Sequence, residues 1–333
     1  MENNTNEIAP KLVKSTAVIT GASSGVGLAT AQLFAKKGFN LVLAARGEDG
    51  LQRAVETCRA LGAAAVYKAT DMSIASEVQR LAEFAVTEFG RIDVWVNNAG
   101  VMASGKFEEI PMDVAEQVIK TNLMGYLHGA YYVLPVFKEQ NQGILINNVS
   151  IGGYMPAPFS SAYSASKFGI KGLMSGLQSE YSNFPEIHIC NIYPQVQRST
   201  GNSHSAKYSG LDFKVPPFAA DPRDTAKTIW KLVQKPKNDT FPDITSYALK
   251  VAHSIFPHGF TNIATSVMRM MMKVNNGQNE EGNVLEPSEN PHAVYGETSL
   301  PVPSRTTKKW LAASLLLGAG LLVASQMSKG NKK

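Results

Sequence analysis

Residues 17–27 read Ala-Val-Ile-Thr-Gly-Ala-Ser-Ser-Gly-Val-Gly, an apolar strand pattern that runs into a glycine-rich turn and then into a helical pattern. Glycines at such a turn allow a tight bend, a close approach of the backbone to a pyrophosphate and close packing of the helix on the strand. The backbone N–H groups at the start of the helix then face the anion. The stretch therefore predicts a nucleotide-binding strand–turn–helix unit at the front of the chain.

The alternation of strand and helix patterns continues to about residue 192. The apolar runs are nearly continuous, which is typical of strands that crossover helices bury on both faces. We therefore expect an α/β fold, a Rossmann-like doubly wound parallel sheet in a single domain. The expected strands are 17–20, 41–44, 65–67, 92–96, 143–147 and 187–192, and the expected helices between them are 28–37, 51–61, 77–89, 114–138 and 164–181.

The pattern loosens after Pro194. Residues 195–220 have many turn formers and little periodicity, which predicts a long loop. Asp221 and Pro222 then provide an N-cap and a first helical position, so a helix is expected over 221–234. Residues 246–274 predict one or two further helices that are apolar and rich in methionine.

The composition excludes several classes of protein. A chain of 333 residues with 44% hydrophobic residues is not disordered. The net charge of +5 comes from residues 305–333, which hold six basic residues and no acidic one, so the rest has one more acid than base. Residues 1–304 therefore lack the positive field that binds nucleic acid. Two isolated cysteines and six scattered histidines predict no disulfide framework and no metal site.

A second group of residues suggests acid–base chemistry. Tyr163 and Lys167 lie four positions apart and share one face of a predicted helix. A phenol with its ordinary pKa near 10 is a poor catalyst at neutral pH, and a neighbouring ammonium lowers that pKa. A hydroxyl such as that of Ser150 can hydrogen-bond the reacting oxygen, and Asn122 lies earlier in the chain.

Arg46 follows the second predicted strand. An acidic residue at this point would accept hydrogen bonds from the ribose 2′-OH of NAD, whereas an arginine can pair with the 2′-phosphate of NADP. The alternative is a solvated arginine in a loop.

Taken together, residues 13–273 resemble the short-chain dehydrogenase/reductase family. The glycine turn is similar to the family's glycine motif, Asn97-Asn98-Ala99-Gly100 to its fourth-strand motif, and Asn122, Ser150, Tyr163 and Lys167 to its catalytic tetrad. The resemblance implies that Tyr163 is the general acid–base, Ser150 orients the substrate oxygen, Lys167 binds the nicotinamide ribose and tunes Tyr163, and Asn122 holds a water in the proton relay. It implies adenine contact at Asp71. The expected cofactor-binding residues are Gly21, Ser23, Ser24, Gly25, Val26, Gly27, Arg46, Asp71, Asn98, Ala99, Gly100, Tyr163, Lys167 and Pro194.

The chain departs from the family pattern after the sixth predicted strand. Members usually have Pro-Gly there, followed by a threonine near the nicotinamide carboxamide, whereas this chain has Pro194-Gln195. The glutamine could crowd the nicotinamide or offer it a polar contact. Either Ser199 or Thr200 could take the threonine's role.

The end of the chain predicts a membrane anchor. Residues 275–309 are dominated by Asn, Gly, Glu, Pro and Ser, which predicts a disordered linker. Residues 310–328 form a run of nineteen without a charge, and a helix of that length is about 28 Å long, close to the thickness of the bilayer core. Lysines on both sides and Trp310 suit the interfaces. The alternative is a helix buried against the body or in an oligomer interface.

The expected organisation is thus an N-terminal extension (1–12), a catalytic domain (13–274), the linker (275–309), a transmembrane helix (310–328) and a basic tail (329–333). No apolar run precedes Thr16, so no secretory signal is predicted. We expect a single-pass membrane protein with its catalytic domain in the cytoplasm.

The function expected from this reading is NADP(H)-dependent hydride transfer between nicotinamide and a carbonyl or secondary alcohol. The apolar tail and the methionine-rich region suggest a lipophilic small-molecule substrate. The resemblance also implies a homodimer or homotetramer. An NADP(H)-binding membrane adaptor without turnover is the alternative, and Gln195 is the one feature that favours it.

Overall fold

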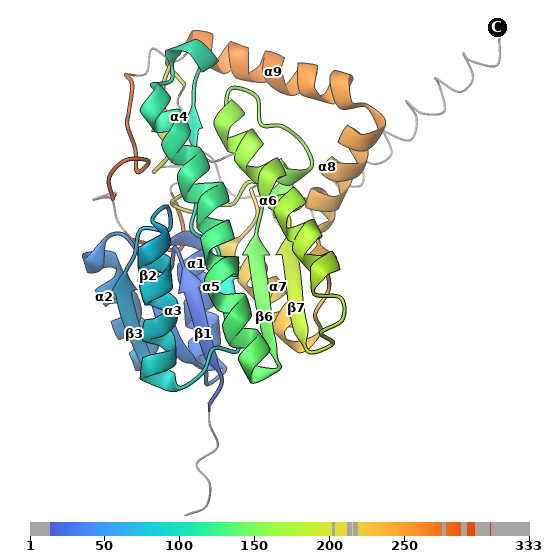
Figure 1. The fold of residues 1–333 in the computed structure, drawn as a ribbon. Helices are drawn as coiled ribbons and strands as arrows, with labels where there is room; N and C mark the ends of the chain where they lie inside the picture. The colour runs from blue at the N-terminus through green and yellow to red at the C-terminus, as the bar shows by residue number, and fades with distance from the viewer. Residues whose placement is uncertain are drawn as a thin grey trace, which may run out of the picture.

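The computed structural model describes residues 14–201, 204–211, 215, 219–274, 278–287, 292–296 and 307. Seven parallel strands form its main sheet, in the order β3-β2-β1-β4-β6-β7-β9 (Figure 1). These strands are β1 (Thr16–Thr20), β2 (Asn40–Ala45), β3 (Ala65–Ala69), β4 (Val94–Asn97), β6 (Gly143–Asn148), β7 (Ile187–Ile192) and β9 (Asp239–Thr240). The doubly wound parallel sheet and its six expected strands are confirmed, and β9 is a short addition that pairs with β7.

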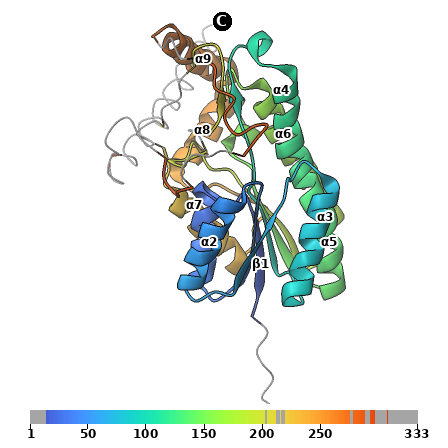
Figure 2. The ribbon, with the colours of Figure 1, turned by 90° about the vertical axis from the view of Figure 1, so that its left-hand side faces the viewer.

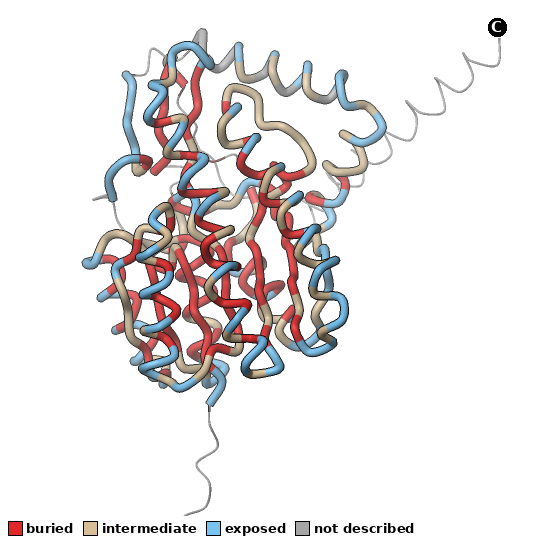
Figure 3. The backbone as a smooth tube through the Cα atoms, in the orientation of Figure 1, coloured by how far each residue is buried: buried red, intermediate tan, exposed pale blue. Residues whose placement is uncertain are grey.

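Helices cover both faces of the sheet (Figure 2). On one face, α1 (Gly25–Lys36) packs between α2 (Glu48–Ala60) and α7 (Pro222–Gln234). On the other lie α3 (Ala75–Phe89), α5 (Gly125–Gln140) and α6 (Ser161–Glu180). The central strands are buried along their length (Figure 3), because the apolar side chains that alternate along each strand meet a helix layer on either side.

The remaining elements lie beyond the carboxyl ends of the strands (Figure 1). A π-helical turn (Lys120–Met124) joins α4 (Met112–Ile119) to α5, so the expected helix over 114–138 is one nearly continuous rod. One short strand, β8 (Ala206–Lys207), lies in the expected loop 195–220 and pairs with β5 (Ala103–Ser104). The other helices are α8 (Ile244–Ile255), α9 (Pro257–Val274) and the 3-10 turns Phe107–Glu109 and Ile151–Gly153.

Strand order explains where a ligand would bind. The chain leaves β1 towards β2 and leaves β4 towards β6, so the connections turn in opposite directions between the adjacent strands β1 and β4. Such a switch point opens a crevice at the carboxyl ends of the strands. The glycine turn after β1 and the Asn97-Asn98-Ala99-Gly100 motif at the end of β4 therefore meet there.

The expected disordered linker is wrong for residues 278–287 and 292–296. Glu280 forms a β-bridge with Lys207, and Val284 and Val294 are buried. Contacts with distant parts of the chain hold these residues in place, and local composition does not reveal such contacts.

Within the part of the chain that the structure describes, no helix is both long enough and apolar enough to cross a membrane. The predicted span 310–328, the basic tail 329–333 and the N-terminal extension 1–12 lie outside the described residues.

Candidate active site

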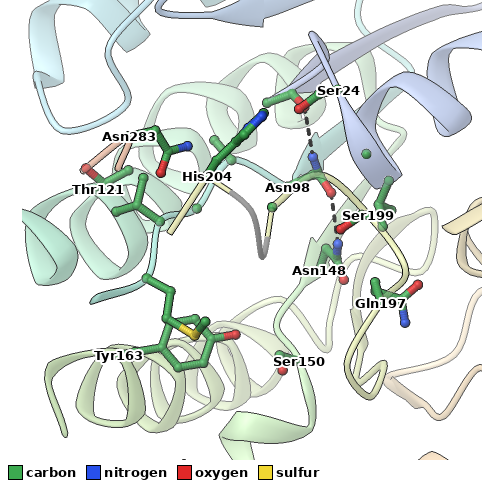
Figure 4. A pocket seen from close by; sticks show the side chains of 18 of the residues that line it. Ser24, Asn98, Thr121, Asn148, Ser150, Tyr163, Gln197, Ser199, His204 and Asn283 are labelled. Carbon is green, nitrogen blue, oxygen red and sulfur yellow. Dashed lines mark hydrogen bonds between the residues drawn. The ribbon is translucent and has the colours of Figure 1, made fainter. Parts of the chain in front are cut away.

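A cavity of about 510 Å³ opens at the carboxyl ends of β1, β4 and β6 (Figure 4). Its wall includes the glycine turn, the end of β4, the segment after β6, the start of α6 and the segment after β7. Of the expected cofactor-binding residues, the wall contains all except Gly27. Sequence segments that lie far apart along the chain therefore meet around one space.

The glycine turn contains backbone conformations that residues other than glycine adopt with difficulty. Gly21 and Gly25 have φ angles of +62° and +54°, in the left-handed region that favours glycine. A side chain at Gly27 would overlap the carbonyl oxygen of Gly21. The glycines thus let α1 begin directly at the cavity with its N-terminal amides near the wall.

Asn98 braces this turn from the neighbouring strand. Its side-chain nitrogen donates to the carbonyl oxygen of Thr20 at 2.9 Å, and its backbone N–H donates to Thr20 Oγ1 at 2.9 Å. Asn148, the last residue of β6, donates from its side chain to Asn98 Oδ1 at 2.8 Å (Figure 4). Asn98 lies where we expected it, and its hydrogen bonds make it a support of the turn.

Ser150 and Tyr163 lie on the same wall of the cavity (Figure 4). Burial raises the pKa of Tyr163, and the nearby Ser150 hydroxyl opposes this shift. Ser150 has a φ of +98°, a strained angle for a non-glycine residue and one that clusters at functional sites. The Ser150 hydroxyl also accepts the backbone N–H of Gly152 at 3.2 Å.

Lys167 is buried beside this pair. Its Nζ lies 5.4 Å from the ring centre of Tyr163 and 5.2 Å from that of Tyr126. Burial lowers the pKa of Lys167 to about 7. The expected lowering of the Tyr163 pKa by the lysine is therefore not met in this structure, because desolvation disfavours both the ammonium and the phenolate.

Asn122 is fully buried in the π-helical turn and makes three bonds to protein. Its Oδ1 accepts the backbone N–H of Val101 at 2.8 Å, and its Nδ2 donates to the Val101 carbonyl and to Ser166 Oγ, both at 3.0 Å. A π-turn is common at functional sites. Here it turns Asn122 towards the segment after β4, so Asn122 ties that segment to α6.

Arg46 lies at the cavity wall, as expected, but its guanidinium is already engaged. Nη1 donates to the carbonyl oxygens of Val284 and Leu285 at 3.0 and 3.1 Å, and Nη2 donates to those of Asn283 and Glu286. Burial lowers the pKa of Arg46, and the nearby carboxylates of Asp71 and Glu286 oppose this shift. The solvated-arginine alternative is wrong for this structure.

Gln195 does not project its amide freely into the cavity. Its side-chain nitrogen donates to Asp243 Oδ1 at 3.3 Å, at the start of α8. Ser199 contacts the glycine turn, since a Cβ at Gly25 would lie 3.2 Å from Ser199 Cβ. Thr200 donates from Oγ1 to the Ala293 carbonyl at 3.3 Å. Both candidates for the threonine position therefore lie near the glycine turn.

Sequence reasoning missed several residues of the site. Asn148, Tyr126 and Ser166 support its expected members, and their positions next to predicted motifs were the available signal. Asn283, Pro287 and His292 line the cavity from the C-terminal part of the chain. No local signal marks them. Among the described residues, no group of three or more His, Cys, Asp or Glu side chains is placed to hold a metal.

The sequence pattern of the short chain dehydrogenase family matches residues 15–208. An uncharacterized oxidoreductase of Staphylococcus aureus is 32% identical over 234 residues, which cover 70% of this chain and 97% of the relative. The oxidoreductase YxnA of Bacillus subtilis is 28% identical over 263 residues, 78% of this chain and 73% of the relative.

Solved structures show the same likeness. A short chain dehydrogenase/reductase from Burkholderia phymatum in complex with NAD has a TM-score of 0.65 and 27% identity, over 72% of this chain and 93% of that one. Actinorhodin polyketide ketoreductase with NADPH has a TM-score of 0.63 and 26% identity, over 68% and 95% of the two chains.

Proposed function

Because this chain belongs to the short-chain dehydrogenase/reductase family of oxidoreductases, we propose that it transfers a hydride between NADP(H) and a carbonyl or secondary-alcohol carbon of a lipophilic substrate. The observation that carries the proposal is that Ser150, Tyr163 and the buried Lys167 line the same cavity as the glycine turn, with Lys167 Nζ 5.4 Å from the Tyr163 ring centre.

The cavity suits a nicotinamide dinucleotide in its chemistry. The start of α1 and the glycine turn offer backbone N–H groups to a pyrophosphate. Two buried polar atoms of wall residues, Asn148 Oδ1 and His292 Nδ1, have no hydrogen-bond partner among the described residues. Such orphaned atoms suit a polar ligand that would satisfy them. Relatives in this family are seen with NAD and with NADPH, and Arg46 is our reason for proposing NADP(H).

The roles of the chain's own residues follow from their placement. When bound, the nicotinamide supplies or accepts the hydride. Tyr163 gives its phenolic proton to the carbonyl oxygen during reduction and takes it back during oxidation. Ser150 donates a hydrogen bond to the same oxygen and holds it against Tyr163. Lys167, buried beside the Tyr163 ring, would contact the nicotinamide ribose, while Asn122 fixes the segment after β4 that faces them.

The lining of the cavity supports an apolar substrate. Beside the polar residues, the wall contains apolar side chains from the segments after β4, β6 and β7, namely Val101, Met102, Ile151, Met155, Pro156 and Val196. Burying an apolar substrate surface against such a wall is favourable.

Turnover of the full-length chain tests the proposal. NADPH and NADH oxidation would be followed with matched panels of apolar and polar aldehydes and ketones, with Tyr163→Phe alongside. We expect turnover with NADPH and apolar carbonyls, and a loss of about 10²–10⁴-fold in Tyr163→Phe. Nucleotide binding should stay within about threefold, because the ring remains. Binding of NADPH without turnover of any carbonyl would contradict the enzyme and favour the adaptor.

We also propose that residues 310–328 anchor the chain in a membrane with residues 13–274 in the cytoplasm. The proposal rests on the uncharged run and its flanking lysines. Carbonate extraction of cell membranes should leave the full-length chain in the pellet and release a variant that ends at residue 309. Release of both proteins would contradict the anchor.

A homodimer or homotetramer is our proposal for assembly. Large apolar side chains are exposed on two long helices, among them Tyr131 on α5 and Phe168 on α6. Covering such side chains drives association. Light scattering of the full-length chain should give a molar mass that is a multiple of 35.9 kDa, the mass of one chain. Tyr131→Glu should lower this molar mass. A monomeric unsubstituted protein would contradict the proposal.

A further inference from the structure

Two stretches near the C-terminal end, residues 280–287 and 292–296, form what we call the strap. They lie at the carboxyl ends of the sheet strands, close to the cavity (Figure 2). At one end, Glu280 pairs its backbone with that of Lys207 through hydrogen bonds of 2.7 and 2.8 Å, and its carboxylate lies 3.0 Å from Lys207 Nζ. The Asn283 N–H donates to the His204 carbonyl at 2.7 Å. The strap is thus held by backbone pairing.

The other end of the strap is held by side chains. Val294 is buried in the core beside α1 and α7. The Tyr295 ring lies 4.6 Å from the Arg198 guanidinium and 5.0 Å from that of Arg223, and its hydroxyl donates to Asp221 Oδ2 at 3.3 Å. Val284, between the two ends, is buried in a cluster that packs against Tyr163.

Two glycines let the strap approach the body this closely. A Cβ at Gly282 would lie 2.5 Å from the His204 carbonyl oxygen, and a Cβ at Gly296 would lie 2.5 Å from that of Ser199. Backbone atoms cannot move aside as a flexible side chain can, so any larger residue would push the strap away. Docking therefore depends on two positions that do not line the cavity.

Between these anchors, the strap bonds to groups that a dinucleotide would use. Four strap carbonyls accept from the Arg46 guanidinium. The Ala293 carbonyl accepts the N–H of Gly25 at 2.9 Å, at the first residue of α1. This N–H is one of the amides that a helix start offers to an anion. The Glu286 carboxylate also interacts with the Arg46 charge.

We propose that the docked strap selects against the 2′-phosphorylated dinucleotide, so that NADP(H) binds only after the strap has left Arg46. The inference rests on the proposed function of the cavity. A 2′-phosphate must displace the four carbonyls from Arg46 and lie near the Glu286 carboxylate, whereas the ribose hydroxyl of NAD(H) brings no charge to this point. The strap therefore determines nucleotide preference, and NADPH and strap docking oppose each other reciprocally.

Nucleotide binding to full-length variants tests this. Gly282→Ala and Gly296→Ala should each undock the strap, and Gly259→Ala is the matched control because its Cβ would meet no atom within 4 Å. Since affinity scales with the competent fraction, we expect the NADPH Kd to fall by about tenfold. The NADH Kd should fall by less, because NADH gains the Gly25 N–H but has no 2′-phosphate for Arg46. Adding Arg46→Ala to Gly296→Ala should abolish the gain. An unchanged or higher NADPH Kd in both undocked variants would overturn the proposal.

Hydrogen exchange of the unsubstituted chain gives a second readout that needs no variant. The amides of Glu280, Asn283 and Gly296 donate to residues of the body, so NADPH should speed their exchange and NADH should speed it much less. Slower exchange with NADPH would show that the strap closes over the nucleotide, which overturns competition. If no variant binds either nucleotide, the proposed function fails as well. If NADPH binds and the strap does not respond, only the strap proposal fails.

Discussion

Gln195 donates a hydrogen bond from its side-chain nitrogen to the carboxylate of Asp243, 3.3 Å away. Asp243 caps α8 by accepting the N–H of Ser246, and the Gln195 N–H donates to Ser246 Oγ at 3.0 Å. The residue that stands where the family usually has glycine thus ties the segment after β7 to the start of α8. Its amide is engaged by the protein, which removes the feature that favoured an adaptor.

Replacing Gln195 should therefore affect stability more than chemistry. Gln195→Gly removes a buried bond to a charged group and adds backbone freedom, so we expect a loss of about 2 kcal/mol in the free energy of unfolding. Turnover per folded molecule should stay within about threefold. Chemical denaturation and initial rates measure the two effects, with Gln142→Gly, at an exposed position outside the cavity wall, as the control. Full stability with lost turnover would mean that the amide acts on the nicotinamide.

Gly27→Ala should disrupt the glycine turn, because its Cβ would overlap the Gly21 carbonyl. Overpacking of this kind costs about 1–3 kcal/mol, and the displaced turn should bind NADPH at least about tenfold more weakly. Gly176→Ala is the control: its Cβ meets no atom within 4 Å, and replacing a helical glycine stabilises by about 0.5–1 kcal/mol. Thermal unfolding and nucleotide titration should separate the two variants, and equal behaviour would contradict the close approach.

Lys167 should make stability depend on pH in a defined direction. Its pKa is lowered by burial from 10.5 to about 7 in the folded chain. Between these values the unfolded chain keeps the proton that the folded chain has lost, so the free energy of unfolding rises with pH, by up to about 1.4 kcal/mol per unit. Below pH 7 both states are protonated and this contribution is flat.

Comparison with Lys167→Met isolates this effect. The wild-type free energy of unfolding, minus that of the variant, should rise from pH 7 to pH 9 in denaturant titrations. Lys235→Met, at an exposed position, should show no such change. A difference that stays constant over this range would show that Lys167 keeps its proton on folding.

Asn122 should be essential to the structure as well as to the site. Asn122→Ala removes three buried hydrogen bonds and leaves the Val101 N–H without its acceptor, which we expect to cost about 2–4 kcal/mol. Asn262→Ala on the exposed part of α9 should cost less than about 0.5 kcal/mol. Denaturant titration compares them, and a loss of turnover in Asn122→Ala at unchanged stability would instead indicate a purely chemical role.

The doubly wound parallel sheet and its glycine turn were predictable because they depend on local patterns and general packing rules. Continuous apolar runs such as Leu41–Ala44 need two covering layers, and a glycine turn after the first strand forces α1 to begin at the sheet edge. Asn122, Ser150, Tyr163 and Lys167 were assigned to one site through their resemblance to the family's catalytic tetrad.

The side-chain environments were not predictable in the same way. The pKa of Tyr163 depends on how deeply the ring and Lys167 are buried together, which is a property of the packed layers. Likewise, only the position of α8 shows what Gln195 binds.

The sequence by itself determined the doubly wound sheet and the glycine turn, because each is encoded in residues that are close in the chain or follow a fixed period. Only the tertiary structure decided the environment of Arg46. Its partners Val284 and Leu285 lie 238 and 239 positions later, in a segment without apolar periodicity. They bind Arg46 through backbone carbonyls, which every residue carries, so the residue types at these positions do not reveal the contact. The contact forms only when the sheet, the loop after β7 and the strap have come together.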